Sequence, residues 1–259
     1  MRVLLTRPAE RSEDLGSILQ AHGIGCVVES MLDIVPEPWD GTILPVYQAV
    51  LVTSLYASRA LLEARRVDRD LRIFAVGPAT ARPLLQAGFT DVPVAGGTAE
   101  SMIGLVRREA DPTAGRLLYL SGLHISRDLV SALTPEGFAV DRSVVYRAVA
   151  VTDMSATLRR EIDEGRIDAV VLFSVRTAMT FRRLMVEANL VGACAGMTAI
   201  AFSSRIAEAL APLRFRHLEI AASPHLDDAI DAVLRARDIL VGRKARHSDP
   251  GSRSGAPAR

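Results

Sequence analysis

The sequence predicts an α/β protein of two lobes, each a parallel sheet flanked by helices, joined by a two-stranded antiparallel ladder. Three observations predict it. Short β-branched runs alternate with helical patterns almost to the end of the chain, which favours parallel sheets covered by helices. The chain repeats itself internally. Each repeat also contains an extended segment much longer than an ordinary strand of about 5–6 residues.

The elements follow one another in a regular order. Strands are expected at 2–6, 26–35, 48–53, 72–76, 116–120, 140–151, 168–173, 198–202 and 218–221. Helices are expected at 9–21, 56–65, 79–87, 99–109, 126–134, 155–164, 176–188, 204–211 and 226–237. The last stretch, "GRKARHSDPGSRSGAPAR", loses apolar periodicity and gains Gly, Ser, Pro and Arg. We therefore expect residues 241–259 to be a disordered, solvated tail.

The internal repeat has three collinear parts. "RVLLTRPAERSEDLGSILQAHGIGCVV" aligns with "RLLYLSGLHISRDLVSALTPEGFAVDR" at an offset of 114 residues, with residue 2 opposite residue 116. "QAVLVTS" aligns with "DAVVLFS" at an offset of 120, which places Ser54 opposite Ser174. "IFAVGPATARPLLQAGFTDVPVA" aligns with "AIAFSSRIAEALAPLRFRHLEIA" at an offset of 126. The similar composition of all α/β units is a weaker explanation for three matches in the same order.

The two long extended segments are "CVVESMLDIVPEP" and "FAVDRSVVYRAVAV". Strands of this length can begin in one lobe and end in the other. We expect residues 26–36 and 140–151 to pair as antiparallel strands. The sequence by itself leaves open whether the lobes are consecutive or swapped.

Composition narrows the class of function. The chain has 259 residues, of which 49% are hydrophobic and 24% are charged, and its net charge is +1. These values predict a folded protein and argue against broad binding to nucleic acid or to a membrane surface. The start "MRVLLTRP" lacks the apolar region of a signal peptide, and Cys26 and Cys194 cannot form a disulfide framework. We expect a cytoplasmic protein.

Small or hydroxyl residues end several strands just before a helix. They are Thr6, Arg7, Thr53, Ser54, Thr80, Ser121, Ser174 and Ser204. In open α/β sheets, ligands bind beyond the carboxyl ends of the strands, where helix N-termini offer free N–H groups to carboxylates or phosphates. Taken singly, each Ser or Thr is also a good helix N-cap. Their recurrence in both halves favours a shared space between the lobes that binds a large polyanion.

The usual nucleotide and metal motifs are missing from the sequence. It contains no G-x-G-x-x-G, no Walker A loop and no G-x-S-x-G elbow, and no His, Cys, Asp or Glu set has metal-ligand spacing. Tyr146, in "SVVYRAV", lies opposite Leu32 of the first copy and so breaks the repeat. Its phenol, with a pKa of about 10, stays protonated at neutral pH and could donate to a departing hydroxyl. A core tyrosine bonded to the backbone is the alternative.

In these features the chain resembles the uroporphyrinogen-III synthase family, over about residues 1 to 238. The supporting motifs, in the order of the family, are "VLLTRP", "VLVTS", "AVGPATA", "VVYRAV" and "VVLFS". The resemblance implies a swapped layout, with residues 1–35 and 148–240 in one lobe and 38–145 in the other. It also implies an enzyme that cyclises hydroxymethylbilane, an octacarboxylate, to uroporphyrinogen III with inversion of the terminal pyrrole ring and loss of water.

The resemblance carries over to particular residues. Tyr146 matches the tyrosine proposed to help the hydroxyl leave, and Thr80 and Ser174 match polar residues of the family's cleft. The second lobe departs from the pattern, because its turn reads "SSRIA", with Arg205 and Ile206 in place of threonine. In the first lobe, Tyr56 stands where the family often has a smaller or basic residue.

The same resemblance implies that no metal or organic cofactor takes part. It implies a monomer, and it allows transient contact with the upstream bilane-forming deaminase. Nucleic acid and membranes are not expected partners. Two other classes stay open: a non-catalytic cytoplasmic two-lobed sensor of polyanions, and a transferase with twin α/β lobes.

Overall fold

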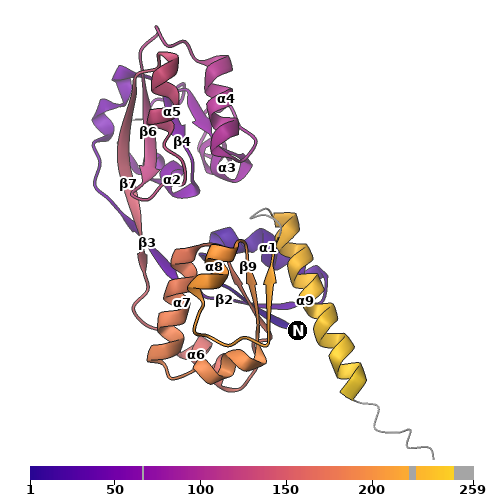
Figure 1. Cartoon of the computed structure of the whole chain (residues 1–259). Helices are drawn as coiled ribbons and strands as arrows, with labels where there is room; N and C mark the ends of the chain where they lie inside the picture. Colours follow the sequence, from indigo (N-terminus) through magenta and orange to yellow (C-terminus); the bar gives the residue numbers. More distant parts are fainter. Residues whose placement is uncertain (66, 222–225, 248–259) are drawn as a thin grey trace, which may run out of the picture. The chain divides into compact units, whose positions relative to one another are not determined.

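The structure, a computed structural model, describes residues 1–65, 67–221 and 226–247. The chain divides into two compact units (Figure 1). Unit 1 comprises Met1–Asp33 and the chain from Ala150 onward, and unit 2 comprises Ile34–Val149. None of the described helices is long and apolar enough to span a bilayer.

Unit 1 is built on a five-stranded sheet in the order β10-β9-β8-β1-β2. The strands are β1 (Arg2–Leu5), β2 (Gly25–Val28), β8 (Ala169–Leu172), β9 (Thr198–Ala201) and β10 (His217–Ile220). All neighbouring pairs are parallel. The helices are α1 (Ala9–Ala21), α6 (Ala156–Asp163), α7 (Val175–Glu187), α8 (Ser204–Ala209) and α9 (Leu226–His247), and η3 (Val191–Gly196) is a 3₁₀ helix.

Unit 2 is built on a second five-stranded sheet in the order β3-β7-β6-β4-β5. The strands are β3 (Leu32–Pro36), β4 (Tyr47–Val52), β5 (Ile73–Ala75), β6 (Arg116–Gly122) and β7 (Val140–Ala150). The helices are α2 (Leu55–Glu63), α3 (Pro78–Gln86), α4 (Ala99–Glu109) and α5 (Leu129–Leu133), with 3₁₀ helices η1 (Gly41–Val46) and η2 (Thr134–Glu136). Strands β5, β4, β6 and β7 are mutually parallel.

The strands of both sheets are apolar because both faces are covered, as parallel sheets require. In unit 2, α2 and α3 pack on one face through Leu61 and Leu84, and α4 and α5 pack on the other through Met102 and Leu133. In unit 1, helix α1 joins the same core as α9. The first helix therefore packs with the C-terminal part of the chain, in keeping with a layout that has residues 1–35 and 148–240 in one lobe.

The topology confirms the internal repeat. The order β9-β8-β1-β2 in unit 1 matches β5-β4-β6-β7 in unit 2, so each strand has the same place in its sheet as its counterpart from the sequence alignment. The sheet of unit 1 contains β1 and β2 from the first copy of the repeat and β8, β9 and β10 from the second. The sheet of unit 2 contains β4 and β5 from the first copy and β6 and β7 from the second. The chain therefore passes twice between the units, within β3 and near the end of β7.

The pairing predicted for the long segments is correct only in part. Strand β3 lies beside β7, and the bonds from Glu37 N to Val145 O (3.0 Å) and from Val151 N to Met31 O (3.2 Å) give an antiparallel register. Residues 25–28, however, form β2 and pair with β1 instead. The expected single strand at 26–35 is interrupted because Met31, fully buried, bonds through its N–H to Thr6 O.

The end of the chain also differs from expectation. Helix α9 continues to His247, where a tail was expected from residue 241. Arg, Lys and Ala are strong helix formers, so losing apolar periodicity removed the reason for burial but not the propensity for helix. Residues 248–259 of the expected tail lie outside the described residues.

Candidate functional site

The carboxyl ends of the unit 2 strands gather most of the predicted site residues. Because β5, β4, β6 and β7 run parallel, these strands end at one edge of the sheet. Thr53 and Ser54 follow β4, Thr80 lies in the first turn of α3, and Ser121 is near the end of β6. Tyr146 is in register with Gly122, the last residue of β6. We call this the unit 2 carboxyl edge.

Several of the predicted hydroxyls are engaged within the protein. Ser54 is buried, and its side chain accepts from the N–H of Ala57 at 3.1 Å, capping α2. Thr80 is also buried, and its carbonyl accepts the Ser58 hydroxyl at 2.8 Å, which ties α3 to α2. Ser54 is therefore a helix N-cap. Together, these two bonds hold the starts of α2 and α3 at the unit 2 carboxyl edge.

Tyr146 is held by its ring. A side chain on Gly122 would place its Cβ 2.7 Å from the Tyr146 ring, so only glycine lets the ring lie against the backbone there. On α2, Tyr56 lies with its ring centroid 5.4 Å from that of Tyr146, at an interplanar angle of 55°. Tyr146 is half-buried, and none of the described residues forms a hydrogen bond with its hydroxyl.

Sequence reasoning missed two residues of this edge, Tyr119 and Arg142. Tyr119 is 2% exposed, and its hydroxyl lies 3.1 Å from the Thr53 hydroxyl. Burial raises the pKa of Tyr119, so its phenol stays protonated. Arg142 stands opposite Tyr119 in the β6–β7 register and donates from Nε to the Ser121 hydroxyl at 2.8 Å. The spacing Tyr119-x-Ser121 on a strand, which puts both side chains on one face, was the available signal.

The unit 1 carboxyl edge comprises the ends of β1, β8 and β9. Thr6 is 2% exposed, and its hydroxyl donates to Val171 O at 2.6 Å, which joins β1 to β8. The guanidinium of Arg7 lies 3.5 Å from the centroid of the Phe173 ring, which stacks on Phe202 at 4.5 Å. Here Arg7 and Phe173 occupy the positions at which unit 2 has the hydroxyl residues Ser121 and Thr53.

Ser174 and Ser204 differ in role. Ser174 caps α7 by accepting from Thr177 N at 3.1 Å, with the same backbone angles as Ser54, its counterpart in the repeat. Ser204 is exposed and lies inside α8, whose N-cap is Ser203. The alignment at offset 126 already pairs Ser203 with Gly77, the N-cap of α3.

The altered turn of the second half of the repeat still starts a helix. Ser203 accepts from the N–H of Ile206 at 3.3 Å. Ile206 is 5% exposed and belongs to the core of unit 1, so the residue that replaces threonine has become a packing residue.

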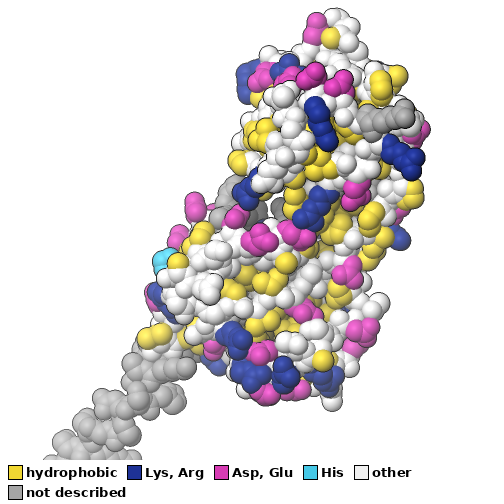
Figure 2. All heavy atoms as spheres, turned by 180° about the vertical axis from the view of Figure 1, so that it is seen from behind, with side chains coloured by type: hydrophobic (Ala, Val, Ile, Leu, Met, Phe, Trp, Pro, Cys, Tyr) yellow, Lys and Arg dark blue, Asp and Glu magenta, His cyan; other side chains and the backbone are white. Residues whose placement is uncertain are grey.

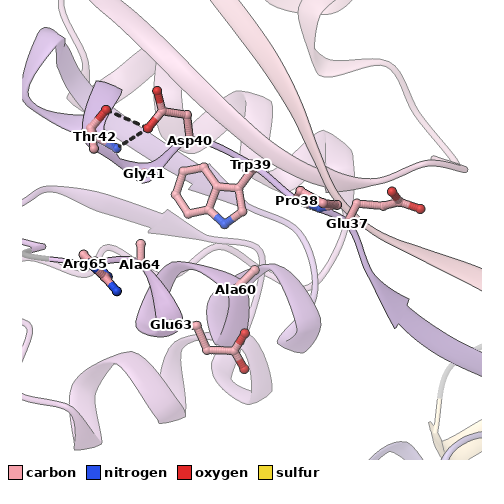
Figure 3. A pocket seen from close by; sticks show the side chains of 10 residues that line it. All are labelled: Glu37, Pro38, Trp39, Asp40, Gly41, Thr42, Ala60, Glu63, Ala64 and Arg65. Atoms are coloured by element: carbon pink, nitrogen blue, oxygen red, sulfur yellow. Dashed lines mark hydrogen bonds between the residues drawn. The ribbon is translucent and has the colours of Figure 1, made fainter.

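A pocket of about 400 Å³ lies elsewhere in unit 2 (Figure 3). Trp39 forms one wall, and the lining includes the carboxylates of Glu37, Asp40 and Glu63. Its residues precede β4 and end α2, and a Cβ on Gly41 would lie 2.8 Å from that of Ala64. The pocket is therefore at the opposite end of β4 from Thr53. Three carboxylates suit a polyanion poorly, so we do not assign the substrate to this pocket.

Basic and acidic side chains lie among one another on the face drawn in Figure 2. Many form ion pairs, such as Arg147 with Glu37 at 2.7 Å and Arg72 with Glu109 at 2.7 Å. In the part of the chain that the structure describes, no group of three or more His, Cys, Asp or Glu side chains could hold a metal ion.

Comparison with known proteins gives a consistent result. The family model described as uroporphyrinogen-III synthase HemD matches residues 13–231. The solved uroporphyrinogen-III synthetase of Helicobacter pylori 26695 is 18% identical, with 91% of this chain and 99% of that chain covered and a TM-score of 0.55. A mutant uroporphyrinogen III synthase of Thermus thermophilus is 18% identical, with 92% and 99% covered and a TM-score of 0.48. Among curated protein sequences, none matches the chain.

Proposed function

This chain belongs to the uroporphyrinogen-III synthase family, and we propose that it binds hydroxymethylbilane through the carboxyl edges of its two sheets. The family cyclises this linear tetrapyrrole to uroporphyrinogen III, inverting the terminal pyrrole ring and releasing water. The family match over residues 13–231 carries the assignment. The sites of binding and of proton transfer are the parts proposed here.

Helix starts supply the binding groups in this proposal. The first turn of a helix leaves backbone N–H groups without partners inside the helix, and the helix dipole favours negative charge there. Helices α2, α3 and α7 begin at the carboxyl edges, each after a residue with extended backbone angles. An octacarboxylate offers many groups to such N–H donors. Ser54 and Ser174 contribute by fixing where these helices start.

Tyr146 is the proposed proton donor. The carbon–oxygen bond of the hydroxymethyl group breaks, and the oxygen leaves as water with the phenolic proton. The resulting azafulvenium cation is attacked by the substituted carbon of the terminal ring, and the spiro intermediate fragments and recloses with that ring inverted. The proton released when the ring system recovers its aromaticity restores the phenol. The placement of the Tyr146 ring between Gly122 and Tyr56 supports this role.

Most of the remaining catalysis comes from positioning. The chemistry needs a folded bilane in which one carbon, rather than its unsubstituted neighbour, attacks. Holding the reacting atoms in such a geometry can lower a barrier by roughly 7–11 kcal/mol. Carboxylate contacts at two edges would fix the chain of four pyrroles at several points. Thr6, Arg7, Thr53, Thr80, Ser121 and Ser204 remain candidates for this role, of which only Ser204 is exposed.

The test is incubation of the purified chain with freshly made hydroxymethylbilane, followed by oxidation and separation of the porphyrin isomers. Uroporphyrin III is expected. Spontaneous closure gives the type I isomer without inversion, so type I alone at the rate of the buffer control would overturn the proposal. Bilane that binds but stays linear would indicate the non-catalytic polyanion sensor instead.

We also propose that the protein acts as a cytoplasmic monomer and meets the bilane-forming deaminase only transiently. Cys26 and Cys194 are free thiols, which is in keeping with a reducing compartment. Sedimentation velocity with and without the deaminase tests both points. We expect this protein to sediment as a monomer in both experiments, and transfer of bilane from the deaminase to be detected only in coupled activity assays. A stable species that contains both proteins would contradict the proposal.

A further inference from the structure

Arg142 is exposed and is held at the unit 2 carboxyl edge by three hydrogen bonds. Its Nε donates to the Ser121 hydroxyl at 2.8 Å, and its Nη2 donates to Gly122 O at 2.7 Å and to Leu123 O at 2.9 Å. Leu123 in turn donates its N–H to Tyr146 O at 2.9 Å. The guanidinium therefore holds the end of β6, where Gly122 lies against the Tyr146 ring.

The bonding of Arg142 is incomplete. A guanidinium carries five N–H donors. Three are accounted for by the Ser121, Gly122 and Leu123 oxygens. Among the described residues no acceptor bonds the two N–H groups of Nη1. All three acceptors are neutral, so none of them cancels the positive charge.

Three other arginines of the same unit each pair with a carboxylate. Arg116 pairs with Asp141, Arg147 with Glu37 and Arg72 with Glu109. Arg142 forms no ion pair with any carboxylate of the described chain. The pKa of the nearby Asp128 carboxyl is lowered, first by the Ser131 hydroxyl that bonds to it and to a lesser degree by the charge of Arg142. The Asp128 oxygens also accept from Val130 N and Ser131 N at the start of α5.

The neighbours of Arg142 complete a polar face. Tyr119 is directly opposite it on β6, and the Tyr119 hydroxyl lies 3.1 Å from the hydroxyl of Thr53, the residue that follows β4. Three adjacent strands thus present a fixed cation and hydroxyl groups at one edge. This combination suits a carboxylate, because a guanidinium binds carboxylates in a bidentate geometry and hydroxyls add further donors.

We propose that Nη1 of Arg142 binds a carboxylate of the tetrapyrrole substrate on the same edge as Tyr146. The proposal rests on the proposed function, since it takes hydroxymethylbilane as the ligand. It assigns to Arg142 a binding role, with a second effect on the position of Tyr146 through the β6 end. Arg142→Lys keeps the charge but loses the fork of donors, and Arg142→Gln loses both.

Steady-state kinetics with hydroxymethylbilane tests the proposal. A hydrogen bond to a charged group is worth about 1.5–3 kcal/mol, so Arg142→Gln should raise KM about 10- to 100-fold, and Arg142→Lys should raise it less. Raising the salt concentration should increase KM of the wild type more steeply than KM of Arg142→Gln, because salt screens a positive charge that the variant does not have. A purely structural role for Arg142 would not change this salt dependence.

The control is Arg116→Gln, which removes one positive charge from the neighbouring strand at the other end of the sheet, where Arg116 is paired with Asp141. Its KM should stay within about twofold of the wild type. A second readout is the binding of uroporphyrin III, a fluorescent octacarboxylate, measured by anisotropy. It reports affinity without turnover and applies equally to a variant that no longer turns over.

The outcomes separate two failures. If the wild type gives only the type I isomer, the proposed function fails. If the wild type gives type III but Arg142→Gln and Arg116→Gln have the same KM, salt dependence and affinity for uroporphyrin III, the carboxylate role of Arg142 is wrong. Should Arg142→Gln melt below the assay temperature, Arg142→Lys decides by the same comparison, with unchanged KM and affinity overturning the proposal.

Discussion

The two carboxyl edges share a strand order but differ in side-chain chemistry at matching positions. Thr53 of unit 2 corresponds to Phe173 of unit 1 at offset 120, and Ser121 corresponds to Arg7 at offset 114. In unit 2 these positions belong to a set of hydroxyls bonded to Tyr119 and Arg142. In unit 1 the counterparts form a cation–π stack at 3.5 Å. The repeat therefore determines the position of each carboxyl edge in its sheet, and the side chains determine its chemistry.

From this difference we expect unit 2 to carry the proton transfer and unit 1 to contribute binding. Hydroxyl groups and a fixed tyrosine suit donation to a leaving group, whereas flat aromatic rings suit contact with pyrroles. Four predictions, each tested with one or more substitutions, bear on this comparison.

The largest effect is expected from Gly122→Ala. Its Cβ would lie 2.7 Å from the Tyr146 ring and would displace it. Turnover should fall about 100-fold, as for a misplacement of about 1 Å, and unit 2 should lose about 1–3 kcal/mol of stability. Trp39, the single tryptophan of the chain, lies in unit 2, so its emission follows the unfolding of that unit. Gly192→Ala is the control, because open space surrounds that position; equal activity of the two variants would contradict the prediction.

Tyr146→Phe should come next. It removes the proposed proton donor while leaving the ring between Gly122 and Tyr56. We expect turnover to fall roughly 30-fold, below the usual 10²–10⁴-fold, because the hydroxymethyl group of an electron-rich pyrrole leaves readily and water can replace the phenol. Melting temperature and turnover at saturating bilane are measured together. Unchanged turnover with a lower melting temperature would make Tyr146 a structural residue.

Tyr119→Phe should act on binding more than on turnover. Because burial raises the pKa of Tyr119, the phenol can donate to Thr53 and leave the Thr53 hydrogen for a substrate carboxylate. A neutral hydrogen bond of about 0.5–1.5 kcal/mol predicts a KM about 3- to 10-fold higher with kcat nearly unchanged. Thr53→Val should match it, and the double variant should be no worse than either single one. Additive losses would show that the two hydroxyls act independently.

The smallest effect separates two neighbouring serines of unit 1. Ser203→Ala removes the N-cap of α8 and should cost about 1 kcal/mol in the free energy of unfolding. Ser204→Ala, at an exposed position of the same helix, should change it by less than about 0.5 kcal/mol. Urea unfolding followed by circular dichroism provides the measurement, and a larger loss for Ser204→Ala would reverse the assignment.

Much of the fold could be read from the sequence because local signals and the repeat agreed. The helix at 99–109 was predicted with the bounds of α4, whose Thr98 forms a capping box with Ser101. The failures have a different origin. The break before β3 depends on a contact between Met31 and Thr6, and no local pattern of residues encodes it.

The candidate site was harder to predict than the fold. The predicted hydroxyl residues follow strand ends, but Ser54 and Ser174 cap helices and Thr6 joins two strands, and their role in binding stays a prediction. Tyr119 and Arg142 were not predicted because their placement together depends on cross-strand register, which sets Tyr119 opposite Arg142. Ser204 was chosen over Ser203 although the repeat pairs Ser203 with the N-cap Gly77.

The double crossing of the chain between the units has a consequence for synthesis on the ribosome. Unit 2 is one continuous stretch, 34–149, and has all its strands once that stretch has emerged. Strand β1, in contrast, needs β8, and Val3 pairs with Ala169. The first thirty or so residues therefore remain without their partner strand β8 while unit 2 is translated, and the apolar β1 stays exposed to solvent during that time. Since domains fold as units during translation, unit 2 should be protease-resistant on stalled chains well before unit 1.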